Sequence, residues 1–186
     1  VPYLDDFFIY NPTLFFAIWV MVSIGMYIGH QEIIMNPQWL THQIGFKIIL
    51  LFISLTFLIG TTFIKNQLML IDLNATHIKQ TPLIKFINKQ RAINILKFSL
   101  IIGGGTLLFT NIYNVILGIL VYLAFNFYFT NKNKFSKKYY FNYSLIFLIL
   151  ILLILNGYAI VLSDSSYFFL VLRNLNFETL LFFIFY

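Results

Sequence analysis

The sequence predicts an all-α protein, a polytopic transmembrane helix bundle with about six spans. Of its 186 residues, 60% are hydrophobic and only 10% are charged, whereas about a quarter of residues are charged in soluble domains. The mean hydropathy is +0.87. A chain this apolar would not stay dispersed in water, so we interpret residues 1–186 as a single integral membrane domain. Its first partner is the lipid bilayer, and no nucleic-acid partner is expected.

The apolar segments that predict these spans follow one another along the whole chain. Roughly 17–25 apolar residues are needed for a helix to cross a bilayer. The segments are 14–29, 44–64, 92–109, 113–129, 144–162 and 167–186. The first is short. The connection between the third and fourth is so tight that these two helices must form an antiparallel hairpin.

Basic residues in two loops predict the orientation. Loop 65–91 carries four lysines and Arg91 against the single Asp72, and loop 130–143 carries four lysines and no acid. With six spans, both loops fall on the same side of the membrane. The positive-inside rule places them on the cytoplasmic or matrix-like side. The expected location is a bacterial inner membrane or an organellar inner membrane.

Small residues and one lysine stand out inside the third predicted span. Gly103, Gly104 and Gly105 lie within the apolar segment, where small residues let helices approach closely. Lys97 is expected to extend its ammonium toward the basic side of the membrane. The chain has no cysteine, so disulfides and thiolate metal sites are excluded.

The polar segment after the second span contains the first candidate site. Asn66, Leu70 and Asn74 are spaced four apart and would share one face of a helix. A Mg²⁺-bridged diphosphate favours carboxylates at such positions, but the asparagines offer neutral amide oxygens. Asp72 lies about 200° around a helix from Leu70, so it reaches the same cavity only where the helix has unwound. Helix capping or interfacial hydrogen bonding is the alternative role of Asn66.

Two segments resemble the UbiA family of intramembrane prenyltransferases. Residues 8–27, which include Asn11-Pro12 and Trp19, are similar to the family's opening Arg-Pro and first apolar helix. Residues 55–67 resemble the helix that leads into its first Asp-rich motif. The resemblance implies transfer of an isoprenoid from a prenyl diphosphate to a lipophilic acceptor, with Mg²⁺ as cofactor. It also implies that Asn66, Asp72, Asn74 and Lys79 line the remnant of the prenyl-diphosphate site.

The chain departs from the family pattern where the chemistry would take place. The family motif has the form Asn-Asp-x-x-Asp-x-x-x-Asp, and the aligned residues here are Asn66, Gln67, Leu70 and Asn74. The second Asp-rich motif would follow residue 186, so the chain is expected to be an incomplete member. Because the carboxylates normally hold the Mg²⁺ ions that stabilise the leaving diphosphate, we expect a degraded site that is weakly active or inactive.

A non-catalytic role is the alternative. Arg173 and Glu178 lie inside the last predicted span, and charges in a span are costly and usually mark a pocket, a pathway or a partner. These two residues predict an intramembrane polar contact with a pocket or another subunit, unless the helix ends early at the interface. The chain would then be a structural subunit of a larger respiratory or photosynthetic membrane complex, an organelle-encoded subunit included.

Overall fold

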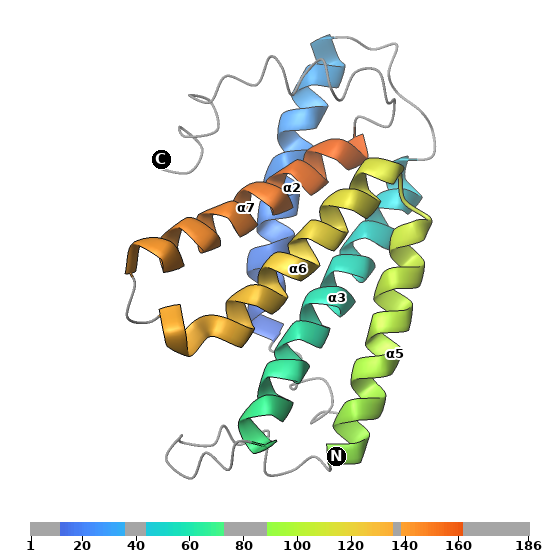
Figure 1. The fold of residues 1–186 in the computed structure, drawn as a ribbon. Helices are drawn as coiled ribbons and strands as arrows, with labels where there is room; N and C mark the ends of the chain where they lie inside the picture. Colours follow the sequence, from blue (N-terminus) through green and yellow to red (C-terminus); the bar gives the residue numbers. More distant parts are fainter. Residues whose placement is uncertain (1–11, 36–43, 73–88, 136–138, 162–186) are drawn as a thin grey trace.

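A computed structural model describes residues 12–35, 44–72, 89–135 and 139–161, and these ranges fold into helices without a strand. The helices are α2 (Pro12–Met35), α3 (Ile44–Asp72), α5 (Lys89–Leu108), α6 (Ile112–Phe135) and α7 (Tyr139–Val161). Figure 1 shows them as one elongated bundle. The predicted all-α class is therefore confirmed.

Four of these helices are long and apolar enough to cross a membrane, by length and composition: α3, α5, α6 and α7. The apolar part of α2 is shorter and spans Phe15–His30, as the sequence predicted. The chain is a membrane protein of helical type. The sixth predicted span, 167–186, lies outside the described residues, so the number of six spans stays a prediction.

Successive helices run in alternate directions, and α3 lies between α5 and α6 (Figure 1). α7 packs against both α6 and α2. The end of α3, the start of α5, the end of α6 and the start of α7 therefore lie at one end of the bundle, here called the Asp72 end. Which side of a membrane this end faces stays a prediction from the loop charges.

The predicted hairpin is present between α5 and α6. The amide of Thr110 donates to the carbonyl of Leu107 (3.0 Å), and the side chain of Asn111 accepts from the amide of Asn114 (2.8 Å). Asn111 thus caps the first turn of α6. The two helices diverge after this turn, because each packs mainly against α3 or α7 rather than against the other.

All five described helices extend beyond their predicted apolar segments, and α2, α3 and α6 differ most from the prediction. The segment 66–72 is the last part of α3, and residues 130–135 belong to α6, although both were expected in loops. Ile64 and Leu68 pack against Ala92, Ile95 and Leu96 of α5. This contact continues the helix past the apolar segment, and leucine, methionine and glutamine favour helix on their own.

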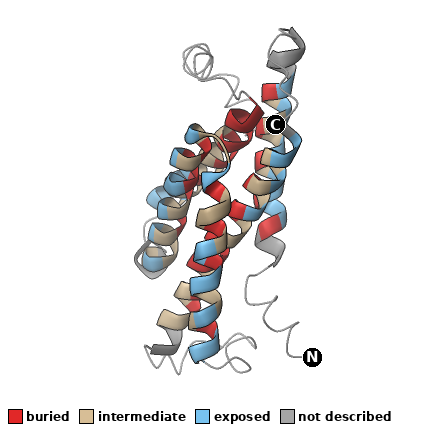
Figure 2. Ribbon diagram, turned by 90° about the vertical axis from the view of Figure 1, so that its right-hand side faces the viewer, coloured by how far each residue is buried: buried red, intermediate tan, exposed pale blue. Residues whose placement is uncertain are grey.

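Glycine allows α2 and α7 to cross in backbone contact. A Cβ on Gly25 would overlap the carbonyl oxygen of Ile154, and a Cβ on Gly157 would overlap that of Val22. Figure 2 shows the buried positions gathered on the inner faces of the helices. Val22 and Tyr158 are among the largest side chains that are fully buried at this crossing. The crossing is thus the tightest helix contact that the described glycines make.

The three glycines of α5 differ in their packing. A Cβ on Gly103 would lie 3.0 Å from both the amide nitrogen and Cγ of Leu58, whereas one on Gly104 or Gly105 would meet nothing within 4 Å. Ser54 also donates a hydrogen bond to the carbonyl of Gly103 (2.9 Å). The predicted role in close helix packing is confirmed for Gly103 alone.

Candidate functional site

The predicted diphosphate remnant is described only in part. Asn66 is half-buried within α3, and Asp72 is the last residue of that helix. At 100° per residue the two positions are about 120° apart around the helix axis. Because α3 stays helical up to residue 72, no local unwinding brings them onto one face. Asn74, Lys79, Arg173 and Glu178 lie outside the described residues, so their predicted roles stay predictions.

A cation inside the α3 span contacts a polar side chain of α6. The Lys65 ammonium donates to Oδ1 of Asn126 at 3.0 Å, in a partly buried position. Lys65 belongs to the apolar span Gly45–Met69 and Asn126 to the span Ile112–Asn131. From the sequence, Lys65 was expected in a loop, and Asn126 was not singled out. An asparagine within an apolar span was the available signal, but it does not identify the partner.

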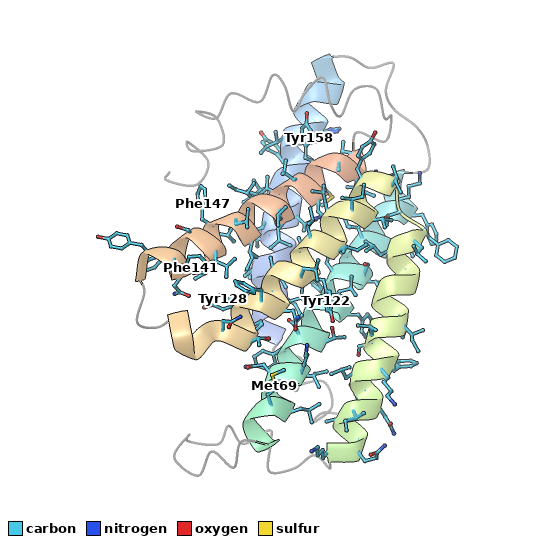
Figure 3. All side chains as sticks on the ribbon, in the orientation of Figure 1. Met69, Tyr122, Tyr128, Phe141, Phe147 and Tyr158 are labelled. Carbon is cyan, nitrogen blue, oxygen red and sulfur yellow. The ribbon has the colours of Figure 1, made fainter. Side chains whose placement is uncertain are left out.

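An aromatic-walled cavity lies between α2, α3, α6 and α7, here called the bundle cavity. Its volume is about 340 Å³, and its lining includes Phe63 of α3, Tyr128 and Phe129 of α6, and Ala17 of α2. The rings of Phe63 and Phe129 meet edge to face, with centroids 5.9 Å apart. In Figure 3, Tyr128 lies in the half of the bundle toward Met69, near the Asp72 end.

The polar pair and the bundle cavity are neighbours on the same two helices. Phe63 and Lys65 are two residues apart on α3, and Asn126 lies between Phe125 and Phe129 on α6. Lys65 and Asn126 are not among the residues that line the cavity. At 100° per residue Phe63 and Lys65 are about 200° apart around α3, so Lys65 lies within one helical turn of the cavity along the axis but on another face of the helix.

A second hollow of about 480 Å³ opens between α2 and α3, lined by Trp19, Phe52, Thr56 and neighbouring apolar residues. The indole Nε1 of Trp19 donates to Oγ1 of Thr56 at 2.9 Å, and the Trp19 ring meets the edge of Phe52. Trp19 is 44% exposed. Because its single donor is already used, this groove offers chiefly apolar contact.

A buried asparagine cluster joins α6 to α7 at the opposite end of the bundle. Nδ2 of Asn114 donates to the carbonyl of Asn156 (2.7 Å), and Nδ2 of Asn111 donates to the carbonyl of Ala159 (2.8 Å). Asn114 and Asn156 are fully buried. This cluster was not predicted from the sequence, although polar residues inside two apolar spans marked it. Its contacts are between helices, so we assign it to helix pairing.

The electrostatics of the described part are dominated by cations. All six Asp and Glu residues of the chain have side chains outside the described set. The described basic side chains in the helices are Lys47, Lys65, Lys89, Arg91 and Lys97. Within this set there is no group of three or more residues of the types that ligate metals through His, Cys, Asp or Glu. Because the acidic side chains lie outside the described set, the structure does not test whether a Mg²⁺ site is present.

No known protein family, curated protein or solved structure matches this chain. Membership of the UbiA family stays a prediction that rests on residues 8–27 and 55–67.

Proposed function

We propose that the chain is a UbiA-like membrane protein that holds an isoprenoid chain inside its helix bundle and transfers it weakly or not at all. The bundle cavity is the observation that carries this proposal. It is about 340 Å³ in volume and lined by apolar and aromatic side chains of four helices. Ligand sites of this kind are typically 300–1,000 Å³ and mostly apolar.

The cavity suits a branched apolar chain. Phe63, Phe125 and Phe129 supply flat walls, and Ile146 and Leu150 of α7 supply aliphatic contact. Aromatic side chains contribute large contact areas at fixed geometry. The lipophilic acceptor would enter from the bilayer, because every surrounding helix is apolar enough to face lipid.

The residues of this chain give little support to departure of the leaving group. In prenyl transfer the departing diphosphate needs its charge stabilised by Mg²⁺, and hard cations prefer carboxylate ligands. The aligned positions Asn66, Leu70 and Asn74 lack a carboxylate, and Asp72 lies on another face of α3. Lys79 would supply one further cation. These residues support binding of a prenyl diphosphate better than its rapid cleavage.

The proposal is tested by isoprenoid binding to the purified protein in lipid nanodiscs, with geranylgeraniol as the probe and native mass spectrometry as the readout. Ala17→Phe places a ring at the exposed edge of the cavity, and we expect binding at least fivefold weaker. Val20→Phe is the matched control, since Val20 is exposed on the same helix and does not line the cavity. Equal affinity in all three proteins would contradict the proposal.

Catalysis is tested separately with geranylgeranyl diphosphate and a lipophilic phenol as acceptor. Any transfer should require Mg²⁺ and be slow. Product that forms at the same rate in EDTA would contradict the Mg²⁺-dependent mechanism while leaving isoprenoid binding intact.

The subunit role remains the second candidate, and the position of α5 favours it. Only 22% of the most apolar stretch of α5 is buried in the bundle, against 50% in α3. Its outer residues include Phe98 and Ile101, which are 61% and 71% exposed. A protein that binds no isoprenoid and migrates in a large complex on native gels would support this role.

A further inference from the structure

The Lys65–Asn126 contact is the most unusual polar feature inside the described spans. Lys65 is partly buried, and the one hydrogen bond shown for its ammonium goes to a neutral amide oxygen. A charged side chain in a span is costly and usually has a polar or charged partner. A neutral amide offsets only part of that cost, because it supplies a dipole and no opposite charge.

We propose that Lys65, which Asn126 orients through a hydrogen bond, binds the phosphate group of a lipid-anchored ligand without a metal ion. The phosphate belongs either to a phospholipid headgroup or to a prenyl phosphate, and for the prenyl phosphate the inference rests on the proposed function. In both cases the same chemistry is used: a lysine ammonium donates to anionic phosphate oxygens as a point charge.

The depth of Lys65 fits this ligand. It lies four residues before Met69, where the apolar span of α3 ends, and Asn126 lies five residues before Asn131, where that of α6 ends. At 1.5 Å per residue both are about 6–8 Å inside the end of the apolar region. The four methylene groups of lysine let the ammonium reach the headgroup level while its stem stays among apolar side chains.

The neighbourhood of Lys65 contains further polar groups but no described carboxylate. Asn66 follows it directly and is half-buried, and the side chain of Gln67 is 6% exposed. Asp72 stands seven residues after Lys65, about 20° from it around the axis of α3, but its side chain lies outside the described set. Lys65 can leave Asn126 for a phosphate oxygen by rotation of its own side chain, so α3 need not move.

The binding experiment compares geranylgeranyl monophosphate with geranylgeraniol on the wild-type protein in EDTA. Nanodiscs of phosphatidylcholine alone remove competing anionic lipid. We expect the monophosphate to bind at least tenfold more tightly than the alcohol, and Lys65→Met to abolish that difference. Lys97→Met is the matched control, since it removes the same charge from an exposed position in the α5 span. Lys65→Arg should retain most of the difference.

A second arm replaces the prenyl ligand with a phospholipid. Wild type is reconstituted in nanodiscs of one part phosphatidylglycerol to four parts phosphatidylcholine, and native mass spectrometry counts the lipids that remain bound. Retention of phosphatidylglycerol that is lost in Lys65→Met and kept in Lys97→Met would assign the phosphate to a headgroup. Binding of neither prenyl probe would contradict the proposed function. Retention of phosphatidylglycerol that depends on Lys65 would still support the present inference in that case.

Two results would overturn the inference. One is equal loss of phosphate preference in Lys65→Met and Lys97→Met, which would indicate an unspecific charge effect. The other is the absence of a Lys65-dependent effect in both arms, with the monophosphate bound no more tightly than the alcohol and no phosphatidylglycerol retained, whether or not geranylgeraniol binds. Circular dichroism and thermal unfolding of Lys65→Met show whether the variant folds as the wild type does, which distinguishes a folding defect from a lost contact.

Discussion

Replacing Gly25 or Gly157 by alanine is expected to destabilise the bundle by about 2–3 kcal/mol, the upper range for overpacking a closed interior. The added Cβ would overlap a main-chain carbonyl oxygen of the facing helix in each case. A carbonyl in the middle of a helix cannot rotate away, so α2 and α7 must separate. The separation would expose Val22 and Tyr158, which are buried at the crossing. Thermal unfolding in detergent, followed by circular dichroism, measures the effect.

The matched controls are Gly104→Ala and Gly105→Ala in α5, where an added Cβ meets nothing within 4 Å. They should leave stability unchanged or raise it by about 0.5–1 kcal/mol, because alanine favours helix over glycine. The Gly25→Ala, Gly157→Ala double variant should lose less than the sum of the two single losses, since one separation of the helices relieves both overlaps. Full additivity, or equal effects at Gly104 and Gly25, would contradict the backbone contact between α2 and α7.

Asn111→Ala is expected to produce the next largest loss, about 2 kcal/mol. The substitution removes two hydrogen bonds: the cap to the amide of Asn114 and the contact to the carbonyl of Ala159, both 2.8 Å. Loss of an N-cap costs about 0.5–2 kcal/mol, and a hydrogen bond between transmembrane helices averages about 0.6 kcal/mol. The cap stabilises the first turn of α6, and the bond to Ala159 holds the start of α6 to the end of α7.

The control for this prediction is Asn131→Ala at the other end of α6. Asn131 donates to the carbonyl of Phe127 within its own helix, at an exposed position. Its loss should change the midpoint of unfolding little. Chemical unfolding in a mixed-micelle titration would compare the two variants, and equal midpoints would remove the assigned role of Asn111.

The sequence predicted the helices through their apolar segments but misjudged where α2, α3 and α6 end. Hydropathy falls after Ile64, so the polar segment that begins at Lys65 was expected to be a loop. The structure continues α3 to Asp72, because Ile64 and Leu68 have apolar partners on α5. No local property of residues 66–72 reveals that a second helix lies alongside them.

The candidate site was likewise predicted only in part from the sequence. Asn66 and Asp72 were identified from the polar segment that follows the second predicted span, and the described helix places them on different faces of α3. Asn126 was not identified, because an amide in an apolar segment gains meaning only when its partner is known. Lys65 is that partner, 61 residues earlier in the chain.

Composition by itself determined that this is a helical membrane protein. Only 10% of the residues are charged, which suits burial in lipid, and a helix satisfies its backbone there through internal hydrogen bonds. The short connection before Asn111 likewise determined the hairpin of α5 and α6. Only the tertiary structure decided that α3 separates these two helices, and that Gly103 packs while Gly104 does not. Those outcomes depend on which face of one helix meets another, and that is a property of side-chain packing between distant segments.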